Sequence, residues 1–167
     1  MDSGTIIDYY LSKPYWLIDI LPCRVPEGSG EQYFQIEKYL LSPRCFASIG
    51  RKFTRMLLKL NCYEDIAICS PGGEWFLNPE PELLVKRLNE RKPLFVWLQS
   101  SYGMISIDGD SHYMTLYLSA DDCLQHTSRY PSLESAALVN HPADYDERLQ
   151  LLRALAASEG LFVWKPQ

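Results

Sequence analysis

The chain has 167 residues, of which 47% are hydrophobic and 22% charged, the composition of a globular domain with one substantial core. With 16 Lys and Arg against 21 Asp and Glu, the formal net charge is −5, which disfavours a nucleic-acid partner along a phosphate backbone. An aromatic content of 13% excludes disorder, because these side chains supply the burial that offsets chain entropy.

The N-terminal part is predicted to be an arm of short helical pieces over residues 1–43, packed on the core of a single domain that spans residues 1–167. Prolines interrupt these pieces, and the segment Tyr15–Leu21 is too apolar to remain in water. Acidic residues before and within the first apolar stretch argue against a signal peptide. No run approaches the roughly 20 apolar residues that cross a bilayer, so no membrane partner is expected.

The clearest helical pattern follows this arm. Apolar residues recur at steps of three and four and so form one stripe of a helix that begins at Pro43, after Ser42 as N-cap, and ends near Asn61 in a left-handed conformation. The stripe consists of Phe46, Ile49, Phe53, Met56, Leu57 and Leu60.

Strand patterns dominate the middle of the chain. A strand is predicted near Tyr63–Cys69, and Trp75-Phe76 extends a short returning strand after a Pro-Gly-Gly turn. A second helix is predicted over Pro79–Arg91. The continuous apolar run Leu94–Leu98 is typical of a central strand that is covered on both faces.

An Asp-Gly turn then predicts an antiparallel hairpin between Met104–Ile107 and His112–Leu118. Strand alternation places His112, Met114, Leu116 and Leu118 toward the helices and leaves the intervening Tyr113, Thr115 and Tyr117 partly exposed.

Helical turns are predicted for Ser119–Gln125 and Ser132–Val139, a terminal helix for Asp144–Ser158, and a last strand for Leu161–Trp164. The order of elements predicts an α+β fold with a mixed, mainly antiparallel sheet of about five strands and helices mostly on one face.

A run of cations on the long predicted helix is the most unusual local feature. Between positions 44 and 60 there are five cations and no acid, so a net charge of −5 for the chain and +5 for this segment leave −10 for the rest. The functional interpretation is a site for an anion or an acidic partner, whereas the simpler one is a solvated helix face beside the protein's own acids. The candidate binding residues here are Arg51, Lys52, Arg55 and Lys59.

Three aromatic residues are further candidates for contact with a partner. Trp75 lies beside a flexible turn, although an aromatic at that position also serves to cover the edge of a core. Tyr113 and Tyr117 lie on the partly exposed face of the predicted hairpin. Such side chains supply buried contact area in interfaces.

Patterns specific for catalysis or cofactors were not found. The cysteines Cys62, Cys69 and Cys123 could pair with a histidine, but no spacing selects a Cys–His pair, and no Cys-x-x-Cys or zinc-like spacing occurs. The paired carboxylates fit turns and helix starts, and the glycine clusters lack the Walker lysine. We therefore assign no catalytic residue, and predict neither metal nor cofactor. Five cysteines without such a pattern favour reduced thiols in the cytoplasm.

The sequence favours a non-enzymatic cytoplasmic interaction protein that binds or occludes a protein partner through an acidic, aromatic-containing surface. In its size, composition and predicted fold class the chain resembles small bacterial cytosolic α+β proteins, including toxin-neutralising immunity proteins. One alternative is a small hydrolase or transferase that uses Arg51 or Arg55 on an anionic substrate, with a titrating residue nearby. Another is a small-ligand binding module with an apolar pocket near Trp97, Trp164 and the N-terminal arm.

Overall fold

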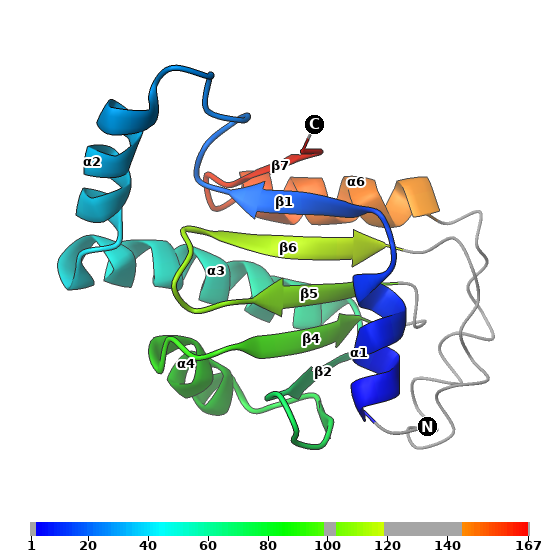
Figure 1. Ribbon diagram of the computed structural model, residues 1–167. Coiled ribbons are helices and arrows are strands. Elements are labelled where there is room, and N and C mark those ends of the chain that lie inside the picture. The colour runs from blue at the N-terminus through cyan, green and yellow to red at the C-terminus, as the bar shows by residue number, and fades with distance from the viewer. Residues whose placement is uncertain (1–2, 99–102, 119–144, 167) are drawn as a thin grey trace.

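In the computed structural model the described residues are 3–98, 103–118 and 145–166. They form an antiparallel sheet in the order β3-β2-β4-β5-β6-β1-β7, with helices on both faces (Figure 1). The strands are β1 (Tyr15–Asp19), β2 (Ile66–Cys69), β3 (Phe76–Leu77), β4 (Leu94–Leu98), β5 (Gly103–Ile107), β6 (Tyr113–Leu118) and β7 (Phe162–Trp164). The helices are α1 (Ser3–Leu11), α2 (Gly30–Leu40), α3 (Pro43–Tyr63), α4 (Pro81–Asn89) and α6 (Tyr145–Ala157).

The predicted α+β class is confirmed, but the predicted strand number and mixed pairing are wrong. The sheet has seven strands instead of about five, and every pair of neighbouring strands is antiparallel. The main addition is β1, which lies between β6 and β7 and pairs Ile18 with Met114. The sequence predicts short helical pieces here instead of a strand, because the nearly continuous apolar run of β1 shows no helical or strand period.

Alternation along β1 explains its place in the sheet. Trp16, Ile18 and Ile20 pack into the core beneath the helices, whereas Asp19 lies on the opposite side of the strand because successive side chains point to opposite faces. Asp19 is nevertheless buried. The N-terminal region is thus part of the sheet itself.

The helices α3, α4 and α6 cover one face of the sheet, which we call the three-helix face (Figure 1). The stripe predicted for α3 is confirmed, since all six of its residues are buried, and all of them except Phe46 belong to the core on the three-helix face. Ser42 occupies the N-cap position, but its hydroxyl donates to the carbonyl of Tyr39 at 2.6 Å instead of capping α3. The helix also runs past Asn61 to Tyr63, where the extended backbone of Glu64 ends it.

The helix α1 covers part of the opposite face, which we call the α1 face (Figure 1). Ile6 and Tyr10 of α1 pack there against Trp75, Trp97 and Met104 in a second, smaller core. The predicted antiparallel hairpin of β5 and β6 is confirmed, and Ile105 lies opposite Leu116.

Met114, Leu116 and Leu118 face the three helices, as expected, whereas His112 precedes β6 and contacts Asp19 of β1 and Tyr33 of α2. The helical turns predicted for Ser119–Gln125 and Ser132–Val139 lie outside the described residues.

Candidate functional site

A groove of about 730 Å³ runs between α3 and α4 on the outside of the molecule. One wall is built by α3, whose lining residues recur about once per helical turn, and the other by α4 and the residues after it. Most of these positions lie beside the apolar stripe of α3 that packs in the core, whereas the buried Phe46 belongs to both the stripe and the lining. The α3–α4 groove is lined by Pro43, Phe46, Ala47, Gly50, Arg51, Thr54, Arg55, Leu58, Val85, Asn89 and Arg91.

Three arginines give this mainly apolar groove a positive charge. Arg51 is exposed and makes no ion pair or hydrogen bond within the described part of the chain. Arg91 stacks over the ring of Phe46, with 4.0 Å between guanidinium and centroid, and its Nε donates to the carbonyl of Gly109 at 3.2 Å. Arg55 is about half exposed and pairs with Glu159. Arg51 is therefore the cation most accessible to an incoming carboxylate.

The remaining candidate cations of α3 lie beside the end of α6. Lys59 Nζ is 2.8 Å from Glu159 and also donates to Ser158, while Arg55 Nε donates to Glu159 at 2.7 Å. Hydrogen bonds from Lys59 and Arg55 lower the pKa of Glu159 below its ordinary value. Lys52 also reaches toward Gly160. Part of the basic edge is thus balanced by the protein's own acid, as the simpler interpretation predicts.

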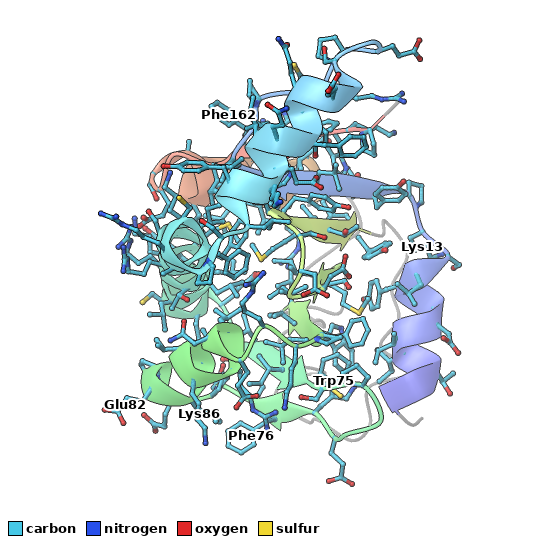
Figure 2. The ribbon with its side chains drawn as sticks, turned by 60° about the vertical axis from the view of Figure 1, so that its left-hand side comes forward. Lys13, Trp75, Phe76, Glu82, Lys86 and Phe162 are labelled. Carbon is cyan, nitrogen blue, oxygen red and sulfur yellow. The ribbon has the colours of Figure 1, made fainter. Side chains whose placement is uncertain are left out.

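The three candidate aromatics do not join the groove. Trp75 is buried and packs against Trp97 at 5.3 Å between ring centroids, and Figure 2 shows it on the side of α1. Tyr113 and Tyr117 are half-buried on the α1 face, where the ring of Tyr117 lies 5.9 Å from that of Tyr15. The sequence candidates therefore occupy separate places instead of one surface.

The structure reveals a buried polar cluster that the sequence did not indicate. His112 and Asp19 are both 2% exposed, and Nδ1 of the histidine lies 2.9 Å from the Asp19 carboxylate. Its Nε2 lies 2.9 Å from the hydroxyl of Tyr33 on α2 and 3.8 Å from the carboxylate of Glu37. These contacts engage both ring nitrogens of His112, as in a hydrogen-bonded structural histidine.

The charges in this cluster favour a charged imidazole and a neutral phenol. The hydrogen bond to Asp19 raises the pKa of His112 against the effect of burial, and Glu37 adds to the rise. Burial, followed by the hydrogen bond and charge of Glu37, raises the pKa of Tyr33 well above its ordinary value. The protonated imidazole is thus more stable than in a free histidine, and the phenol stays neutral, which disfavours Tyr33 as a nucleophile.

Thiols do not complete a nucleophilic site within the described residues. Cys23 is exposed and lines the same pocket of about 260 Å³ as His112, but both ring nitrogens already face Asp19 and Tyr33. Cys69 is buried and donates to the carbonyl of Ser70. Cys123 lies outside the described residues. Nor do three or more potential metal ligands gather anywhere in the part of the chain that the structure describes.

Comparisons of this chain with protein families, curated proteins and solved structures found no match. Of the helices in the described ranges, none has the length and apolar character required to span a membrane.

Proposed function

We propose that this protein is a non-enzymatic interaction protein that binds an acidic amphipathic helix of a protein partner in the α3–α4 groove. The observation that carries the proposal is the exposed Arg51 at an apolar groove between two helices. A cytoplasmic location belongs to the same proposal and is supported by the thiols of Cys23, Cys45 and Cys62, which form no disulfide within the described residues.

The shape of the groove favours a helix as its occupant. Its lining extends along α3 from Pro43 to Leu58, which at the rise of an α-helix is about 22 Å. A partner helix of about four turns would match this length and pack against α3 and α4 at once. Ala47 and Gly50 leave room for its side chains, while Phe46, Leu58 and Val85 offer apolar contact.

Charge selects the sign of the partner. Arginines are the only ionisable side chains among the described residues that line the groove. A helix with carboxylates beside its apolar stripe would pair with Arg51, while a basic helix would be repelled. The proposed partner is therefore acidic and binds a basic groove of this protein. The net charge of the chain alone instead suggests that the protein binds through an acidic surface of its own.

The same lining argues for binding over chemistry at this groove. A hydrolase or transferase acting on an anion would need a base or nucleophile beside Arg51 or Arg55. Thr54 has the only hydroxyl among the described lining residues, and it already donates to the carbonyl of Gly50 at 2.8 Å. The small-ligand alternative, which needs an apolar pocket near both Trp97 and Trp164, is also less well supported. Trp97 is fully buried, and Trp164 lines the pocket of His112, which Trp97 does not reach.

A designed peptide that takes the place of the partner helix tests the proposal. The probe is a 16-residue helical peptide with Leu at positions three and four apart and Glu on the flanking positions, labelled for fluorescence anisotropy. We expect it to bind saturably with one peptide per chain. Replacing its Glu residues by Lys should abolish binding, because the groove arginines repel the cationic peptide.

Two variants and a matched control locate the binding. Arg51→Glu should weaken the affinity for the peptide about tenfold, because an attraction is lost and a repulsion is added. Ala47→Trp should block the groove without a change of charge. Lys86→Glu makes the same charge change on the outer side of α4, where Figure 2 shows Lys86 pointing away from the body, and should leave affinity within about twofold. Equal affinities for all four proteins, or no saturable binding, would overturn the proposal.

A further inference from the structure

The helix α2 is held to the rest of the molecule by few buried contacts. None of its residues is buried, and Phe34, Ile36 and Tyr39 are 66%, 55% and 68% exposed. Figure 1 shows α2 standing at one end of the sheet, next to the beginning of α3. A helix of 11 residues is marginal in water without tertiary contacts, so the contacts that do exist decide whether α2 stays docked.

The main polar contact of α2 with the body is a hydrogen-bonded chain to β1. Tyr33 of α2 meets Nε2 of His112, and Nδ1 of His112 meets Asp19 of β1, each at 2.9 Å. The carboxylate of Glu37, one turn after Tyr33, lies 3.8 Å from Nε2. A buried imidazole therefore lies between a carboxylate of the sheet and a carboxylate of α2.

The two charge states of the imidazole hold α2 differently. When His112 is neutral, its Nδ1–H donates to Asp19 and its Nε2 accepts the Tyr33 hydroxyl, so the charges of Asp19 and Glu37 face each other without a cation between them. When His112 is protonated, both ring N–H groups donate, and the Tyr33 hydroxyl is free to donate to Glu37. The cation then attracts both carboxylates.

We propose that protonation of His112 fastens α2 to the sheet and that its deprotonation loosens α2, which makes this helix a pH-sensitive latch. The latch is independent of partner binding in the α3–α4 groove. The groups that face the imidazole are Asp19 of β1 and Tyr33 and Glu37 of α2, with the ring of Tyr113 edge-on at 5.4 Å. The loop before α2 adds Cys23 and Arg24 to the lining of the same pocket.

The direction of the pH effect follows from the contacts of His112. Its pKa is raised in the folded protein, first through the hydrogen bond to Asp19. The stabilisation from its charge is therefore fully present below the unfolded pKa and is lost as the pH rises through the folded pKa. By thermodynamic linkage, if docking of α2 raises the proton affinity of His112, then protonation of His112 tightens the docking of α2 by the same factor. Release at higher pH would uncover the pocket and the side of α2 that carries Tyr33.

Hydrogen exchange of the α2 amides measures the latch directly. Exchange is followed between pH 5.5 and 8.5, corrected for the intrinsic pH dependence of amide exchange, while NMR of the ring protons gives the midpoint of His112. We expect protection of residues 30–40 to fall about fivefold through that midpoint, while protection of the core of α3 stays constant.

Two variants and a control distinguish a latch from general loosening. Glu37→Gln should lower the midpoint of His112 and remove most of the pH dependence of α2 protection, whereas Glu31→Gln, an exposed carboxylate on the same helix, should change neither. Tyr33→Phe should reduce protection of α2 at every pH. Protection of α2 that does not follow the titration of His112, or that follows it equally in Glu37→Gln, would overturn the proposal.

Discussion

Gly109, in the turn between β5 and β6, is the glycine whose substitution the structure opposes most strongly. Its φ of +89° lies in the left-handed region, and a Cβ atom there would overlap the carbonyl group of Arg91 and approach the nitrogen of Lys92 to 2.8 Å. For Gly109→Ala, the left-handed conformation costs about 1 kcal/mol. Relief of the overlap requires the backbone to move, at a further cost of about 2 kcal/mol. We expect the free energy of unfolding to fall by about 3 kcal/mol.

Gly72 supplies a matched control for the steric part of this loss. It also has a left-handed φ, +76°, but a Cβ atom there meets nothing within 4 Å. Gly72→Ala should therefore cost only about 1 kcal/mol. Urea unfolding followed by circular dichroism gives both values, and equal m-values would show that the two variants unfold as the wild type does.

The comparison also bears on the α3–α4 groove, because Arg91 donates to the carbonyl of Gly109 and lines that groove. Movement of the turn in Gly109→Ala would displace Arg91 from its place over Phe46. If the free energies of unfolding of the two alanine variants differ by less than about 0.5 kcal/mol, the close approach of this turn to residues 91–92 is refuted.

Three further substitutions test the packing and charges of the helices. Arg148→Met leaves the carboxylate of Glu64, which it contacts at 2.9 Å, buried without its partner, so we expect a loss of about 3 kcal/mol at pH 7. Burial already raises the pKa of Glu64, so its carboxylate becomes protonated in mild acid and the loss in stability should shrink there. A loss that does not change with pH in a series of urea-unfolding measurements would contradict this expectation. Glu159→Gln should cost less than about 1 kcal/mol because its cationic partners are half exposed. The pKa of Glu159 is lowered, so its contribution should be present at neutral pH and disappear as the pH falls through the folded pKa; an unchanged difference at low pH would argue against the ion pairs. Leu57→Ala should cost about 2–5 kcal/mol in thermal or urea unfolding, since Leu57 is fully buried, and a loss under about 1 kcal/mol would place α3 elsewhere.

Local patterns predicted the elements whose signal is short-range. The stripe of α3 has a clear helical period, and the Asp-Gly step sets the hairpin of β5 and β6 because its geometry matches the twist of paired strands. The segment Tyr15–Asp19 carries no such signal. Its place between β6 and β7 depends on pairing with strands about 100 and about 145 residues later in the chain, which sequence spacing does not encode.

The candidate sites were predictable to the same limited degree. The run of cations without an intervening acid indicated Arg51 and Arg55 as candidates, because their regular spacing puts them on one edge of a helix. The groove itself requires Val85 and Asn89 of α4, and helical periodicity does not say which helix lies beside α3. The pair of His112 with Asp19 spans 93 residues, so it depended on the position of β1 in the sheet.

Chemical-shift mapping of the isotopically labelled protein with the Leu-Glu peptide tests the proposed docking site most directly. We predict saturable shifts of backbone amides in α3 between residues 43 and 58 and in the segment 85–91, with the largest change near Arg51. Shifts concentrated on the α1 face around Tyr113 and Tyr117, or shifts spread evenly over the molecule, would contradict the assignment of the α3–α4 groove.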